Sequence, residues 1–264
     1  SCTWLPFTNH NPKTTNMNPS FSAFEWSNGL LYDYSKNQYP TKLYAFAGAN
    51  TFQLSPGSTY FVFQHQGFSF INGRFPLAHG YFASMTDKQV FLQGSEDSKA
   101  IIIERIGYNG VFLLGGPIEE KGRLKYIDGC TDSLLIPPVK LGDPCLNHLH
   151  FPAGIDQTMH THPSMRVGLV TRGHGECVTP YGNIPLFPGQ IFIIHEDTGK
   201  KAIGLDGKEY LEGSHCFRTF DGTMDVIAYH PDSDFGPQDE DHPMINRTIV
   251  DGISAKHIDE IKTA

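Results

Sequence analysis

The chain is a succession of short apolar runs broken by turn residues about every 8–12 positions. Such runs occupy residues 59–64 (TYFVFQ), 67–73 (GFSFING), 80–85 (GYFASM) and 99–116. Glycine (27 residues) and proline (18 residues) are frequent, and aromatic residues make up 12% of the 264 positions. This combination favours many short strands joined by tight turns over a helical bundle. We therefore predict an all-β fold of the sandwich or small-barrel type.

The composition divides the chain into three segments. Residues 1–40 are polar and rich in Asn, Ser, Thr and Pro, and we expect an irregular arm or strap that could exchange between the subunits of a homodimer. Residues 41–130 carry a first series of strands, and residues 131–264 carry a second. The second series ends in a solvated acidic loop, after which isoleucine spacing predicts a short C-terminal helix over residues 253–262.

An internal repeat links the two strand series. Four identical residues recur 109 positions apart: Gly73 and Gly182, Pro76 and Pro185, Leu77 and Leu186, Gly80 and Gly189. Glycine and proline are common in turns, but the repeated strand rhythm accompanies these identities. We therefore favour duplication of one β-barrel.

Several classes of protein are disfavoured by the composition. The net charge is −8 with histidine neutral, whereas a nucleic-acid-binding surface needs an excess of basic residues. No apolar run is long enough to span a membrane, and no signal-peptide pattern is visible. The five cysteines show no CxxC spacing, which favours reduced thiols. We expect a cytoplasmic protein with no nucleic-acid or membrane partner.

Two histidines, His160 and His162, are separated by one residue in a run with strand character. Alternate side chains of a strand point to the same face, so this spacing brings two imidazoles to one point. A first-row metal ion needs such a pair for its first two ligands. His215 follows later in the chain as a candidate third ligand, and His148 and His150 form a second pair with the same spacing.

The segment that carries the first pair resembles the first conserved motif of the cupin superfamily. That motif is Gly, five residues, His-x-His, three or four residues, Glu, six residues, Gly. The matching positions of this chain hold Gly154, His160, His162, Arg166 and Gly173. Every spacing fits, but arginine stands where glutamate is usual.

The second cupin motif is Gly, five residues, Pro-x-Gly, two residues, His, three residues, Asn. Its start is similar to the turn at Gly189, although His195 stands where proline is usual. The pattern resumes at His215, with Thr219 at the Asn position. We interpret the intervening residues 196–213 as an inserted β-hairpin with the tetrapeptide LDGK at its tip.

The resemblance implies two cupin-type barrels in tandem, each a double-stranded β-helix or jelly roll. The first barrel would be degenerate and without a metal. The second would hold one divalent transition metal on His160, His162 and His215, with Fe(II) the first choice and Mn, Ni, Zn or Cu as alternatives. It implies structural or supporting roles for His148 and His150.

The resemblance further implies a metal-dependent dioxygenase that uses O2 on a small anionic substrate, an organic acid. Arg166 cannot lose its proton and so cannot bind a metal. It either clamps the acid group of the substrate or pairs with a surface carboxylate. His195 is a rival third ligand or a catalytic base. The alternatives are a non-oxidative isomerase, lyase or decarboxylase that uses Mn, Ni or Zn, and a binding module without turnover.

Overall fold

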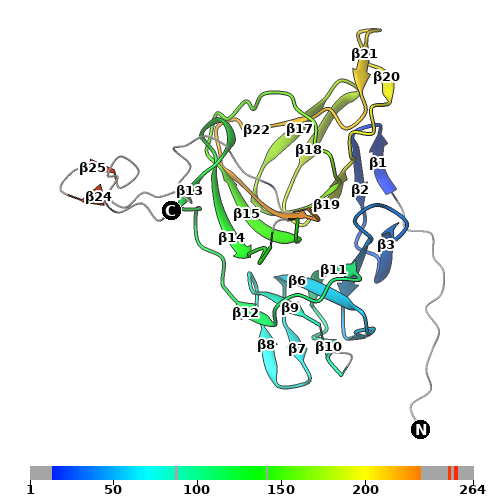
Figure 1. Cartoon of the computed structure of the whole chain (residues 1–264), viewed down its shortest axis with the longest axis vertical. Helices are drawn as coiled ribbons and strands as arrows, with labels where there is room; N and C mark the ends of the chain where they lie inside the picture. Colours follow the sequence, from blue (N-terminus) through cyan, green and yellow to red (C-terminus); the bar gives the residue numbers. More distant parts are fainter. Residues whose placement is uncertain (1–13, 87–88, 141, 233–248, 251–252, 255–264) are drawn as a thin grey trace, which may run out of the picture.

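The computed structural model describes residues 14–86, 89–140, 142–232, 249–250 and 253–254 (Figure 1). Within these ranges the chain forms antiparallel strands and one 3-10 turn, Ile127–Gly129, and no α-helix. The all-β prediction is confirmed. Of the predicted C-terminal helix, only Ile253 and Ser254 are described, and they lie in a strand. The rest of that segment and most of the acidic loop lie outside the described residues.

Two large sheets form the centre of the molecule. The eight-stranded sheet has, in spatial order, β1 (Thr14–Asn18), β2 (Phe21–Phe24), β19 (Ile191–Ile194), β16 (Arg166–Gly173), β23 (Met224–His230), β15 (Cys145–Phe151), β14 (Thr131–Ile136) and β13 (Leu124–Lys125). The six-stranded sheet has β12 (Leu113–Gly115), β9 (Phe82–Met85), β6 (Ser58–Gln66), β11 (Lys99–Ile106), β4 (Thr41–Ala47) and β3 (Gly29–Tyr34).

Smaller sheets cover the outer faces of these two. A four-stranded sheet has β5 (Thr51–Gln53), β10 (Phe91–Gly94), β7 (Ser69–Ile71) and β8 (Phe75–Leu77). A three-stranded sheet has β18 (Gly182–Leu186), β17 (Gly175–Thr179) and β22 (Cys216–Arg218). Two hairpins complete the described strands: β20 (Lys201–Ile203) with β21 (Glu209–Leu211), and β24 (Ile249–Val250) with β25 (Ile253–Ser254).

The sheets enclose separate apolar cores. The eight- and three-stranded sheets surround a cluster that includes Phe151, Phe192 and Met224, and we call this unit the C-terminal barrel. The six- and four-stranded sheets surround a cluster that includes Tyr60 and Leu92, and we call this unit the N-terminal barrel. Each barrel is thus two packed layers of strands around its own core.

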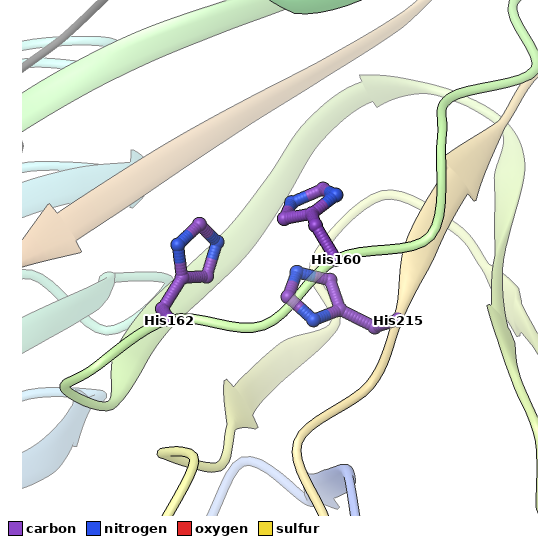
Figure 2. Close-up of side chains that lie close together, drawn as sticks. All are labelled: His160, His162 and His215. Carbon is purple, nitrogen blue, oxygen red and sulfur yellow. The ribbon is translucent and has the colours of Figure 1, made fainter. Parts of the chain in front are cut away.

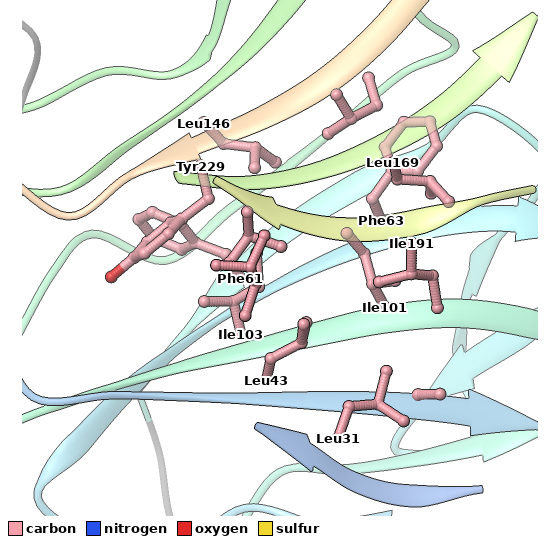
Figure 3. Packing of buried hydrophobic residues seen from close by; sticks show 14 of the residues in the cluster. Leu31, Leu43, Phe61, Phe63, Ile101, Ile103, Leu146, Leu169, Ile191 and Tyr229 are labelled. Carbon is pink, nitrogen blue, oxygen red and sulfur yellow. The ribbon is translucent and has the colours of Figure 1, made fainter. Parts of the chain in front are cut away.

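A third apolar cluster joins the two barrels. Figure 3 shows Phe61 and Ile103 of the six-stranded sheet near Leu146 and Tyr229 of the eight-stranded sheet. β6 and β11 are therefore covered on both faces, which explains their nearly continuous apolar sequences. Burial of one large apolar side chain contributes about 1.5–3 kcal/mol, so this cluster fixes the barrels against each other.

The two barrels share one order of strands. The six-stranded sheet runs β12-β9-β6-β11-β4-β3, and the eight-stranded sheet contains β2-β19-β16-β23-β15-β14 in the corresponding places. β9 and β19 occupy equivalent places and begin 109 residues apart, at Phe82 and Ile191. This arrangement agrees with the internal repeat in the sequence.

The N-terminal segment differs from its prediction. From residue 14 onward it is not an irregular arm, because β1, β2 and β3 are regular strands. β2 pairs with β19 and places Phe21 and Ala23 in the core of the C-terminal barrel, whereas β3 pairs with β4 of the N-terminal barrel. The polar composition does not reveal these strands because β1 is mostly exposed and only Leu31 and Tyr34 of β3 are buried.

The inserted hairpin is confirmed. β20 and β21 pair in register, with residues 204–208 as their turn, and Figure 1 shows them projecting beyond the barrel. No disulfide joins the four cysteines of the described range. Within the described residues, no helix is long and apolar enough to cross a bilayer.

Candidate metal centre

Three histidines meet at one end of the C-terminal barrel (Figure 2). One ring nitrogen from each of His160, His162 and His215 lies within 4.8 Å of the others. Their ring centroids are 4.5–5.1 Å apart. The three residues that the motifs predicted as ligands are therefore brought together.

The backbone around the first pair differs from the predicted strand. β16 begins only at Arg166, and His160 instead forms an isolated bridge with His215, with N–O distances of 2.9 and 3.0 Å. This double hydrogen bond fixes the loop of the first motif to the start of β22. His162 follows in the same loop and faces the other two rings (Figure 2).

Backbone carbonyls set the tautomers of two of these histidines. Nδ1 of His160 lies 2.7 Å from the carbonyl oxygen of Thr158, and Nδ1 of His215 lies 2.8 Å from that of Gly213. A carbonyl oxygen only accepts hydrogen bonds, so Nδ1 carries the proton in both rings. Nε2 is then left with a lone pair for a metal, the usual arrangement of metal-binding histidine.

The protonation of the site also suits a cation. Burial lowers the pKa of His215 to about 3. Burial, with the charge of Arg166 as the next cause, holds the pKa of His162 well below its ordinary value. Both rings are thus neutral at pH 7, and a metal would not have to displace a proton from either.

The histidines open onto a small cavity of about 30 Å³ inside the barrel. Its polar lining comes from the three histidines together with Gln157, Arg166 and His230. The other lining residues are apolar or aromatic: Tyr126, Leu149, Phe151, Val167, Gly168, Phe192, Ile194, Phe217, Val226 and Ala228. The cavity has room for about two water molecules, so a larger ligand would require the lining side chains to move apart.

Arg166 lines this cavity but is not a free cation. It is 6% exposed, and its Nη1 donates to the Oδ1 of Asp232 at 3.2 Å. The same nitrogen also contacts the carbonyl and hydroxyl oxygens of Ser164. The partner carboxylate is buried, at 5% exposed, and is not on the surface as one alternative had it. Nε of Arg166 is buried and has no hydrogen-bond partner among the described residues.

His195, the rival third ligand or catalytic base of the sequence analysis, lies apart from the three histidines. Its Nε2 lies 2.8 Å from the hydroxyl oxygen of Ser22, and its Nδ1 lies 3.4 Å from that of Tyr34. It belongs neither to the histidine cluster nor to the lining of the cavity. His195 follows β19, and its ring contacts β2 and β3. The sequence did not predict that these two strands lie beside β19.

His148 and His150 lie on the face of β15 opposite the cavity, because the cavity is lined by the alternate residues of that strand. Both rings contact Oδ1 of Asp225, at 2.7 and 2.9 Å, and Arg172 contacts the same oxygen at 3.1 Å. This network, in which Asp225 and the two histidines are buried and Arg172 is partly exposed, links β15, β23 and β16. The geometry agrees with a structural role.

Two lining residues were not assigned from the sequence. Gln157 is 5% exposed, and its side-chain oxygen accepts a hydrogen bond from the backbone N–H of Phe217. His230 is the last residue of β23, in which Val226 and Ala228 also face the cavity. The alternation of side chains along this strand is therefore the sequence signal that places His230 on the cavity face. Burial, and then the charge of Arg166, lowers the pKa of His230 well below its ordinary value.

The N-terminal barrel lacks the corresponding histidine. Leu92 and Phe217 occupy equivalent places in the two barrels. The repeated segments lie in β8 and β18, which pair with β7 and β17. Leu92 pairs with Ile71 of β7, and Phe217 pairs with Cys177 of β17. Two residues before Phe217 stands His215, and two before Leu92 stands Val90, which is buried in the core. The equivalent position therefore offers no ligand atom.

Comparison with known proteins adds the fold. No family model and no curated protein matches the chain. Among solved structures, an IolB-like protein from Salmonella typhimurium aligns with a TM-score of 0.54 and 11% identity, over 86% of this chain and 98% of that chain. Ylba from E. coli aligns with a TM-score of 0.52 and 16% identity, over 85% and 91%.

A cupin 2 conserved barrel domain protein from Leptotrichia buccalis aligns with a TM-score of 0.50 and 10% identity, over 79% of this chain and 86% of that chain. Structural similarity at such low sequence identity shows a common fold and does not show a common function. The chain therefore has the all-β, cupin-type jelly-roll fold that its motifs predicted.

Proposed function

We propose that this chain is a metal-dependent enzyme with its centre on His160, His162 and His215, and that it is a non-heme Fe(II) dioxygenase of a small organic acid. The observation that carries the proposal is the convergence of three histidine nitrogens on a mostly apolar cavity. A divalent metal bound there would supply Lewis acidity and open coordination positions. Fe(II) is the first choice because an open imidazole triad suits oxygen activation.

The residues around the triad would bind and orient the substrate. The Nε–H of Arg166 is buried and has no partner among the described residues, so it can donate a hydrogen bond to an acid group of the substrate. Aromatic walls such as Phe151 and Phe192 limit the volume and exclude water, which strengthens every polar contact inside. Positioning in so small a cavity would supply much of the rate.

A second candidate is a non-oxidative isomerase, lyase or decarboxylase that uses Mn, Ni or Zn. The observation in its favour is His230, a neutral imidazole that lines the same cavity. Because the pKa of this ring is low, it would accept a proton only while the negative charge of a bound substrate stabilises the protonated form, and it would then return that proton readily. The imidazole triad fits either chemistry.

The test is the metal content of protein purified without added metal, compared with the variants His160→Ala and His215→Ala. His174→Ala is the matched control, because His174 is exposed and lies outside the cavity. About one iron per chain, lost in both triad variants and kept in the control, supports the centre, and oxygen uptake with small acids then tests the dioxygenase.

Stoichiometric Mn, Ni or Zn lost in the same variants would retain the centre and favour the non-oxidative candidate. Retention of metal in His215→Ala but not in His195→Ala would overturn the assignment of the third ligand. A wild-type protein that takes up no metal after reconstitution would overturn the enzyme proposal, and a binding module without turnover would then be the better account.

A further inference from the structure

Arg166 and Asp232 form a buried ion pair at the edge of the candidate site. Their side chains are 8% and 7% exposed, and Nη1 lies 3.2 Å from Oδ1. Asp232 comes two residues after His230, which lines the cavity together with Arg166. The one arginine of the cavity wall therefore already has a carboxylate partner within the chain.

The ion pair with Asp232 leaves hydrogen-bond donors of the guanidinium group without a partner. A bidentate pair would place two nitrogens on two carboxylate oxygens, whereas one nitrogen, Nη1, makes the contact with Asp232. Nη1 is also shared with the carbonyl oxygens of Ser164 and Met165. Nε is buried and has no hydrogen-bond partner among the described residues, so one donor of Arg166 remains for a ligand oxygen.

We propose that Asp232, which contacts the cavity wall through Arg166 and does not itself line the cavity, determines ligand specificity, because its carboxylate competes with the acid group of a substrate for Arg166. The inference rests on the proposed role of Arg166 in substrate binding. A second carboxylate brought to Arg166 meets the like charge of Asp232 in a buried site, where such repulsion is poorly screened. A neutral oxygen, such as that of an amide, meets no such repulsion.

The pair thus sets how strongly the cavity prefers acids over neutral ligands of the same shape. With Asp232 charged, part of the attraction of Arg166 is cancelled. With Asp232 neutral, the full charge of Arg166 acts on the ligand. Removing one charge should therefore tighten the binding of an acid and leave its amide analogue nearly unaffected.

The experiment measures dissociation constants of glycolate and glycolamide by calorimetry on Zn(II)-loaded wild type, Asp232→Asn and Asp156→Asn. Asp156 is the matched control, because it pairs with Arg218 at the surface and its loss changes the net charge equally. We expect Asp232→Asn to bind glycolate about tenfold more tightly or better, which is the effect of one charged hydrogen bond. Glycolamide should change by less than about twofold, and Asp156→Asn should match the wild type.

An unchanged ratio of glycolate to glycolamide affinity in Asp232→Asn would overturn the proposal, as would equal tightening of both ligands. If the uncompensated charge of Arg166 destabilises Asp232→Asn, thermal shifts of that variant with each ligand, begun at low temperature where it is folded, give the same comparison. Zinc content is measured in every sample. If the wild type binds no zinc, the proposed function fails, and the comparison on metal-free protein still decides the role of Asp232.

Discussion

Gly168 is the position in the cavity wall where one added methyl group has the clearest consequence. It lies in β16, and a Cβ built on it would stand 2.1, 2.4 and 2.6 Å from three ring atoms of Phe192. Carbon atoms in contact prefer about 3.5–4.0 Å, so the ring would have to move by more than about 1 Å. The ring is 2% exposed and packs against Phe21 at 5.3 Å and Phe217 at 6.1 Å between centroids.

We expect Gly168→Ala to lower the free energy of unfolding by about 2–3 kcal/mol, at the upper end of the range for overpacked cores, because the ring of Phe192 is buried and stacks on Phe21, which is itself fully buried. For a chain of this size that corresponds to a fall in Tm of roughly 4–12 °C. The displaced ring also lines the cavity, so ligand binding should weaken in the same variant.

Thermal and urea unfolding of the metal-free protein, followed by circular dichroism, would measure the effect. Gly222→Ala is the control, because it is exposed and its Cβ would meet no atom within 4 Å. A smaller side chain at position 192 should relieve the clash, so Gly168→Ala should lower the free energy of unfolding less in a Phe192→Leu background than alone. A Gly168→Ala variant within about 0.5 kcal/mol of the wild type, or strict additivity with Phe192→Leu, would refute the argument.

Two further predictions concern buried charge. Burial depresses the pKa of His215 from 6.5 to about 3, so the unfolded chain binds a proton that the folded chain refuses. Metal-free protein should therefore lose stability as pH falls from about 6.5 toward 3, by up to about 2 kcal/mol at pH 5, and denaturant titrations of His215→Gln should show a smaller loss. Asp225→Asn should lower the free energy of unfolding by about 3 kcal/mol or more, because it leaves Arg172 and two histidines without their carboxylate. The exposed residue Asp221 gives the matched variant Asp221→Asn, and equal unfolding midpoints for the two variants would contradict this account.

The strands could be predicted from the sequence because their causes are local. The apolar runs of β6 and β11 are continuous since both faces are covered, and the turn glycines that end the strands recur in both halves. The inserted hairpin could also be predicted, because its two strands pair with each other and are adjacent in the sequence. The strand partners of residues 14–34 could not be predicted, because a polar strand has no sequence pattern of its own that identifies the sheet with which it pairs.

The convergence of the three histidines could be predicted because the spacing of a motif reflects its geometry even where the secondary structure differs from the one expected. His160 and His162 lie in a loop and not in a strand, yet the bridge to His215 holds them at the required separation. The position of His195 could not be predicted, for the opposite reason. Its ring contacts Ser22, 173 positions earlier in the chain, and no local pattern reports such a partner.

Arg166, at the position where the first cupin motif usually has glutamate, changes the electrostatics of the candidate site. A glutamate ligand would lower the charge of a divalent ion by one, whereas Arg166 and Asp232 together contribute none. A divalent ion on three neutral imidazoles would therefore keep its full charge in a cavity whose other walls are mostly apolar. Such a charge is poorly screened and favours an anionic ligand at an open coordination position. The substitution at position 166 is thus compatible with acid binding on two counts, the residual charge of the ion and the unpaired Nε–H of Arg166.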